Sequence, residues 1–183
     1  MTTAVSDRTL VASAQAGDRQ SFQQLYRRHY QKVRSTLYQL CGGDGLDDLV
    51  QEVFMRVWKG LAQFRHTAQF STWLYRITWN VACDRRRVLA QQRERSGAED
   101  QLLQVADPRP EQLMQIHYQE LVAKGLAQLS LEHRSVIVLH DLEELPQKEI
   151  SKILGIPVGT VKSRLFHARA QLRQFFKSQG VEL

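Results

Sequence analysis

The sequence predicts an all-α protein in which two small helical domains are joined by a flexible linker. Apolar residues recur at intervals of three and four through most of the chain, which is typical of helices with one buried face, and strand signals are weak. The stretch 91–110 departs from this pattern because it is polar and contains two prolines. We therefore expect a first domain over residues 1–90, a linker over 91–110 and a second domain over 111–178.

The first domain is expected to consist of helices separated by short breaks. An apolar period runs through residues 10–40 and is interrupted by the glycine-rich residues 41–45. The helix that follows carries two aspartates in its first turn, where the helix dipole favours negative charge. After a second break at 60–69, a helix is predicted over 71–87 with Ser71 as its N-cap.

The second domain is expected to end in a helix-turn-helix motif. Pro146 and Pro157 each suit the start of a helix, and Gly155 between them supplies a tight turn. Two short helices joined by a glycine-containing turn are typical of DNA-binding domains. The four helices predicted in this domain span residues 111–127, 131–143, 146–154 and 157–177.

The last of these helices is amphipathic, with an apolar face and a basic face. At about 100° per residue, Val161, Leu165 and Ala168 fall within one narrow arc, whereas several basic residues and Phe166 fall opposite. Lysine and arginine reach phosphates and guanine edges in the major groove, and an exposed aromatic ring can contact thymine methyl groups. The candidate duplex-binding residues are Thr160, Lys162, Ser163, Arg164, Phe166, His167 and Arg169.

The composition of the chain favours some functional classes of protein and argues against others. The 183 residues carry a net charge of +6, which favours an acidic partner such as nucleic acid. No segment has the roughly 18 apolar residues of a membrane span, and the N-terminus lacks the apolar core of a signal peptide, so we expect a cytoplasmic protein without membrane insertion. No phosphate-binding glycine loop, metal-ligand spacing or catalytic signature is present, so we expect no enzyme activity, no cofactor and no metal site.

Three segments together resemble a known family. They are DDLVQEVFMRVWKGLAQFR at 47–65, FSTWLYRITWNVACDRRR at 70–87 and the helix-turn-helix at 146–172. Their order and separation resemble those of the extracytoplasmic-function (ECF) group of bacterial RNA polymerase sigma factors, in the sigma-70 family, over residues 7–178. The resemblance implies a transcription initiation factor, of a group tied to stress responses, whose two domains are sigma domain 2 and sigma domain 4.

The resemblance also implies the partners. They are core RNA polymerase, promoter DNA and an anti-sigma factor. Core polymerase would be contacted through its beta-prime clamp helices and its beta flap, and within the holoenzyme the protein would be associated with the nucleoid. The helix in segment 47–65 exposes acidic side chains, which are unsuited to DNA contact. By resemblance, this face docks on the clamp helices through Asp47, Asp48, Gln51, Glu52 and Arg56.

The segment 70–87 is expected to bind single-stranded DNA. Tyr75 and Trp79 point away from the expected core arc and lie beside arginines, and aromatic rings near cations suit stacked bases and a phosphate backbone. Packing of Trp79 against another helix of the same domain is the alternative. The resemblance implies capture of the melted promoter −10 element, with a pocket loop near 64–69, while the helix-turn-helix reads the −35 element as duplex. The implied −10 residues are Arg65, His66, Gln69, Arg76, Trp79, Asn80, Arg85, Arg86 and Arg87.

Two other functions are compatible with parts of the sequence. A stand-alone helix-turn-helix regulator of the response-regulator type would need an α/β front half, whereas this one shows helices and no strand run. A sigma mimic that titrates an anti-sigma factor would have no need of the basic recognition helix. The promoter sequence, the inducing signal, the arrangement of the free domains and any redox role of Cys41 or Cys83 stay open.

Overall fold

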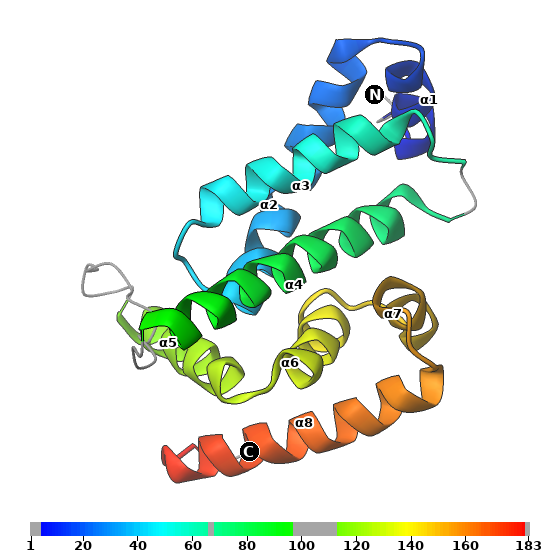
Figure 1. Cartoon of the computed structure of the whole chain (residues 1–183). Coiled ribbons are helices and arrows are strands. Elements are labelled where there is room, and N and C mark those ends of the chain that lie inside the picture. The colour runs from blue at the N-terminus through cyan, green and yellow to red at the C-terminus, as the bar shows by residue number, and fades with distance from the viewer. Residues whose placement is uncertain (1–4, 66–67, 97–112, 182–183) are drawn as a thin grey trace.

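The computed structural model describes residues 5–65, 68–96 and 113–181, and all regular secondary structure in these ranges is helical (Figure 1). The all-α prediction is therefore confirmed. The first domain contains α1 (Asp7–Gln15), α2 (Arg19–Cys41), α3 (Leu46–Leu61) and α4 (Phe70–Ser96). The second domain contains α5 (Leu113–Gln128), α6 (Leu131–Ile137), a π-helical turn η2 (Val138–Leu142), α7 (Gln147–Leu154) and α8 (Val158–Ser178).

Side-chain caps determine where the first two helices begin. The Ser6 hydroxyl accepts a hydrogen bond of 3.2 Å from the Thr9 amide at the start of α1. The Asp18 carboxylate accepts from the amides of Gln20 and Ser21, at 2.9 and 3.3 Å, at the start of α2. The first amides of a helix have no acceptor within it, so these oxygens stabilise both helix starts.

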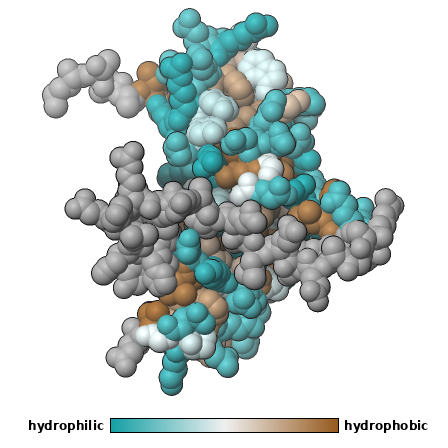
Figure 2. Space-filling view, turned by 90° about the vertical axis from the view of Figure 1, so that its left-hand side faces the viewer, coloured by the Kyte–Doolittle hydropathy of each residue, from teal (hydrophilic) through white to brown (hydrophobic). Residues whose placement is uncertain are grey.

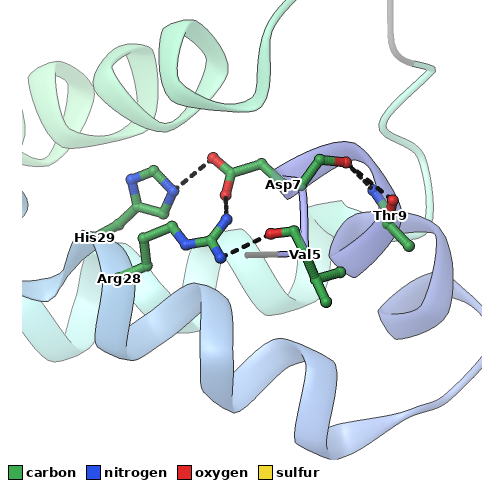
Figure 3. A network of polar contacts seen from close by, with 6 residues as sticks. Val5, Asp7, Thr9, Arg28 and His29 are labelled. Carbon is green, nitrogen blue, oxygen red and sulfur yellow. Dashed lines mark hydrogen bonds and ion pairs between the residues drawn. The ribbon is translucent and has the colours of Figure 1, made fainter. Parts of the chain in front are cut away.

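A polar network fastens α1 to α2 (Figure 3). Arg28 donates to one carboxylate oxygen of Asp7 and to the carbonyl of Val5, and the other Asp7 oxygen lies 2.8 Å from Nε2 of His29. His29 is buried, and its ring packs edge-on against Phe70 of α4. The network therefore ties the first, second and fourth helices together.

Helix α4 is longer than the sequence pattern predicts. It begins at Phe70, so Ser71 lies inside the helix and the prediction of Ser71 as its N-cap is wrong. It continues to Ser96 rather than ending at Arg87, because residues 88–96 are mostly good helix formers without glycine or proline. The rest of the predicted linker, 97–110, lies outside the described part of the chain.

The two domains pack against each other. Figure 1 shows α4 between α3 on one side and α6 and α7 on the other. Helix α4 contacts α7, and α2 contacts both η2 and α6. Buried apolar side chains of both domains belong to one cluster, which includes Leu37 and Leu74 from the first domain and Val138 and Ile150 from the second. On the face seen in Figure 2, hydrophobic colour appears in small separate areas among hydrophilic side chains, as expected when apolar faces point inward.

The predicted helix over 131–143 is divided in two. Helix α6 passes into η2, where the Glu143 amide donates to the Val138 carbonyl at 3.0 Å, a spacing of five residues. Glu144 follows with a φ of +54°, a left-handed conformation that residues with a Cβ adopt only at a cost. This irregular segment carries the chain from α6 to the helix-turn-helix and faces the first domain.

Candidate nucleic-acid and polymerase interfaces

The helix-turn-helix has the geometry that its sequence predicts. Gly155 ends α7 in the left-handed conformation, with a φ of +68°, and α8 begins three residues later at Val158. The Ser151 hydroxyl donates to the Ile156 carbonyl at 2.6 Å across the turn. Ile150 is fully buried against the domain core. These contacts fix the angle between α7 and α8 and so determine where the exposed face of α8 points.

Helix α8 separates its apolar and basic faces as predicted. Val161, Leu165 and Ala168 are at most 2% exposed. Phe166 is 72% exposed, more than any other large hydrophobic side chain that the structure describes. Of the other candidate −35 residues, Lys162, Ser163, His167 and Arg169 are exposed, while Thr160 and Arg164 are half-buried. These seven residues therefore lie around the part of α8 that is not packed against the domain core.

Arg169 is held by a side chain that the sequence pattern did not single out. Its Nη2 and Nε donate to the two carboxylate oxygens of Asp141, at 2.5 and 3.1 Å, and Nδ1 of His140 lies 2.6 Å from the same carboxylate. Burial raises the pKa of Asp141, but the hydrogen bonds from Arg169 and His140 outweigh burial and lower it overall. Asp141 is therefore ionised at neutral pH and orients the Arg169 guanidinium.

The acidic face of α3 is only partly free. Asp47, Asp48 and Gln51 are exposed. Glu52 and Arg56 instead pair with each other at 2.7 Å, and Arg56 also donates to Asp84 of α4 at 2.8 Å. These two hydrogen bonds raise the pKa of Arg56, which stays charged. Asp48 and Gln51 are thus available to a partner, and Asp47 forms only a long ion pair of 3.7 Å with Arg34. Glu52 and Arg56, in contrast, also brace α3 against α4.

A groove of about 640 Å³ lies beside this acidic face, between α2 and α3. Tyr26, Met55 and Trp58 in its wall are 36–45% exposed, a large exposure for apolar side chains, and Trp58 packs edge-on against Phe22. Asp47 and Lys59 lie on its rim. The sequence analysis missed this groove, although Met55 and Trp58 lie outside the apolar stripe of α3 and could have indicated it.

The candidate −10 residues fall into two groups. Arg65, Gln69, Arg76, Asn80 and Arg87 are exposed, and His66 lies outside the described residues. Arg85 is half-buried and donates to Asp44 at 2.6 Å, while Arg86 and Trp79 are also half-buried. Trp79 packs against the hydrophobic core, to which both domains contribute.

The expectation that Tyr75 points away from the core is wrong. Tyr75 is 6% exposed, and its hydroxyl donates to Glu143 of the second domain at 2.5 Å. Burial, and then the hydrogen bond to Glu143, raises the pKa of the phenol, which stays protonated. A wheel of α4 alone could not predict this contact, because Glu143 belongs to the other domain.

Burial disfavours the thiolate form of both cysteines. Burial raises the pKa of Cys41 to about 11, and burial also raises that of Cys83. The reactive species is the thiolate, which is a minor form of both residues at neutral pH. The described side chains also contain no cluster of three metal-ligating residues, and no described helix is long and apolar enough to cross a membrane.

Comparison with known families divides the chain where the fold does. A sequence model of sigma-70 region 2 matches residues 25–92, and a model of sigma-70 region 4 matches residues 119–172. The first match covers most of α2, α3 and α4, which carry the acidic face, the groove and the candidate −10 residues. The second match contains the helix-turn-helix.

Individual relatives match over nearly the whole chain. The ECF RNA polymerase sigma-E factor of Haemophilus influenzae is 32% identical over 178 residues, which cover 92% of this chain and 94% of that protein. The ECF RNA polymerase sigma-E factor of Escherichia coli K12 is also 32% identical, over 180 residues, with coverage of 92% and 93%.

Two solved structures share the arrangement of helices. CnrH, in complex with the cytosolic domain of CnrY, superposes with a TM-score of 0.71 at 27% identity and covers 94% of this chain and 97% of its own. The sigma factor RpoE of Bartonella quintana, in complex with the anti-sigma factor NepR, superposes with a TM-score of 0.74 at 24% identity. It covers 85% of this chain and 96% of its own, and at this identity it supports the fold alone.

Proposed function

The chain belongs to the ECF RNA polymerase sigma factors of the sigma-70 family, and we propose that its two domains recognise the two promoter elements separately. As a sigma factor it binds core RNA polymerase and directs it to promoters. The second domain reads the −35 element as duplex, and the first domain docks on the polymerase and captures the melted −10 strand. The observation that carries this division is the exposed basic face of α8, which lies on a different domain from the acidic docking face of α3.

The −35 contacts are assigned to the exposed face of α8. Lys162 and Arg164 supply phosphate or guanine contacts, and Ser163 can bond to either. Phe166 is 72% exposed, which suits contact with thymine methyl groups. Arg169, oriented by Asp141, contributes a guanidinium at the edge of the same face.

The −10 contacts are assigned to α4 and to the loop before it. Arg65, Gln69, Arg76, Asn80 and Arg87 are exposed and supply cations and polar groups along one edge of the first domain. Trp79, Arg85 and Arg86 are half-buried and would need a change in their neighbours to contact a base. A base taken out of the duplex loses stacking and pairing energy of a few kcal/mol, so the opened strand requires this set of contacts.

Docking on core polymerase is assigned to α3 and the adjacent groove. The exposed side chains of Asp47, Asp48 and Gln51 suit a polar interface, and the groove beside them exposes aromatic surface that a partner helix could fill. The beta-prime clamp helices are the partner proposed for this face, and the beta flap is the partner proposed for the second domain.

No enzymatic role is proposed, and the protein acts in the bacterial cytoplasm, where polymerase and chromosome lie. An anti-sigma factor is proposed as its regulator, because the related CnrH binds the cytosolic domain of another protein. A sigma mimic that only titrates such a regulator is the remaining alternative, and the integrity of the α8 surface argues against it.

The function is tested by separating promoter recognition from polymerase binding. Lys162→Ala and Phe166→Ala remove side chains from the exposed face of α8, and Gln171→Ala serves as an exposed control further along the same helix. The first two variants are expected to lower promoter-dependent transcription at least about tenfold while core polymerase binding stays unchanged. Equal transcription by all three variants would overturn the assignment of α8.

A further inference from the structure

Glu143 joins the two domains through a single carboxylate. Its Oε2 accepts a hydrogen bond of 2.5 Å from the Tyr75 hydroxyl of α4. Its Oε1 lies 2.9 Å from the Thr36 hydroxyl of α2, which shares its one proton between this oxygen and the Lys32 carbonyl at 2.8 Å. Both donors are buried, at 6% and 1% exposure. A side-chain acceptor from the second domain is therefore inserted between two helices of the first, against two buried hydroxyl groups.

Two further contacts extend this interface on either side. The Thr72 hydroxyl lies 3.4 Å from Oε2 of Glu149 on α7, and Nη1 of Arg134 on α6 donates to the Leu40 carbonyl at the end of α2 at 2.9 Å. The contacts thus run along the inner side of the second domain from α6 to α7. Glu143 lies between them and contacts two helices of the first domain at once.

The local backbone around Glu143 is irregular. Glu143 follows the π-helical turn η2 and precedes Glu144, whose φ of +54° lies in the left-handed region. π-Helical turns and left-handed residues with a Cβ are uncommon and cluster at functional and switching segments. The fold therefore maintains an unfavourable backbone at the point where Glu143 is directed into the first domain.

The closed arrangement brings the two proposed DNA-binding sites too close together. Helix α4, which carries most of the candidate −10 residues, packs against α7 of the helix-turn-helix, so the two proposed sites belong to one compact body. The two promoter elements lie about 25 base pairs apart, or about 85 Å of B-DNA. A compact chain of this length has a radius of gyration of only about 16 Å.

We propose that Glu143 is a latch that holds the free protein closed, and that the latch must open before both promoter elements can be bound. This inference rests on the proposed function, because it uses the assignment of the two sites. The docking residues on α3 are exposed in the closed arrangement, so polymerase can engage the first domain before the second is released. Release of the Glu143 hydrogen bonds then frees the second domain to move along the DNA.

The two cysteines are natural probes of this opening. Both cysteines are partly buried. Cys41 follows Leu40, whose carbonyl accepts a hydrogen bond from Arg134 of α6, and Cys41 Sγ lies 4.0 Å from the carbonyl of Ala82, the residue before Cys83. Separation of the domains would remove α6 from this end of α2. The rate at which 5,5′-dithiobis(2-nitrobenzoate) labels them in the full-length protein therefore reports the open fraction, with the labelled residue identified by peptide mass spectrometry.

The decisive comparison is between Glu143→Ala and Glu144→Ala. Both remove one carboxylate from adjacent positions, but the structure gives hydrogen bonds to the domain interface only for Glu143. We expect labelling about tenfold faster for Glu143→Ala and unchanged labelling for Glu144→Ala, because the hydrogen bond from Tyr75 and the shared contact with Thr36 are lost in the first variant alone. Tyr75→Phe removes one hydrogen-bond donor and is expected to accelerate labelling less than Glu143→Ala does. It also provides a second test if circular dichroism shows that Glu143→Ala folds poorly.

The same variants are then assayed in run-off transcription with core polymerase on fragmented genomic DNA. Faster labelling together with faster appearance of transcripts supports the latch. Labelling by Glu143→Ala and Tyr75→Phe at the wild-type rate would overturn it, and so would faster labelling without faster transcription. If Glu143→Ala is labelled faster but neither the variants nor the wild type give transcripts, the proposed function is contradicted, whereas the contact between the two domains is still supported.

Discussion

Substitution by alanine at two glycines of the helix-turn-helix should change the free energy of unfolding in opposite directions. Gly155 has a φ of +68°, whereas Gly159 lies in the first turn of α8. A Cβ at either position would meet no other atom within 4 Å. Steric clash with neighbouring residues is therefore absent at both sites, and only backbone conformation distinguishes them.

The magnitudes follow from this difference. Gly→Ala reduces the freedom of the unfolded chain and stabilises a protein by about 0.4–1 kcal/mol where the backbone is compatible. At Gly155 the left-handed conformation costs alanine about 1–2 kcal/mol, so the net expectation is a loss of about 1 kcal/mol. At Gly159 we expect a gain of about 0.5 kcal/mol in the free energy of unfolding.

Urea denaturation followed by circular dichroism measures both changes. With a slope of about 2 kcal/mol per molar urea, the midpoint should fall by about 0.5 M for Gly155→Ala and rise by about 0.25 M for Gly159→Ala. Gly155→Asn should lose less than Gly155→Ala, because asparagine tolerates the left-handed region better. Two alanine variants that shift the midpoint in the same direction would refute the reasoning about the turn.

Three further predictions concern charge and proton binding. Asp48→Lys reverses an exposed charge on the docking face and is therefore expected to weaken binding to core polymerase about tenfold, as measured by fluorescence anisotropy. Unchanged affinity would show that this part of α3 is not in the interface. Lys162→Ala should reduce the slope of log affinity against log salt concentration for a −35 duplex by about 0.9, and an unaltered slope would mean that Lys162 contacts no phosphate. In a Cys83→Ser background, Cys41 labelling should rise about tenfold per unit from pH 7 to pH 9, because its pKa is about 11 and the thiolate is the reactive form. A plateau near pH 8.5, the ordinary cysteine pKa, would show that the thiol is not buried.

Local features of the chain were predictable from the sequence because they depend on short-range rules. The period of α8 separates Val161 and Leu165 from Phe166, and the structure gives the same separation in burial. Gly155 was identifiable as the turn residue because few other residues adopt a left-handed backbone without strain. Both conclusions need only residues that lie close together in the sequence.

Contacts between distant residues were not predictable in the same way. The burial of Tyr75 depends on Glu143, which lies 68 residues away on the other domain. The ion pair between Arg169 and Asp141 likewise joins two segments whose relative placement depends on tertiary packing. Helical wheels treat each helix alone, so they assign such residues to an exposed face when a neighbouring domain covers them.

The extension of α4 has a different cause. Residues 88–96 have strong helix propensity but a polar composition, and a search for apolar periodicity therefore ended the helix at Arg87. Propensity would have been the better guide here, because a helix propagates readily from a packed start into residues that favour it.

The most direct test of the central claim is run-off transcription from fragmented genomic DNA of the source organism. Core RNA polymerase is assayed with and without the purified full-length protein, and the transcripts are sequenced. The sigma-factor account predicts a small set of start sites that appear only with the protein and share paired elements upstream. No new start sites, together with no binding of the protein to core polymerase, would contradict the account and favour a stand-alone DNA-binding regulator.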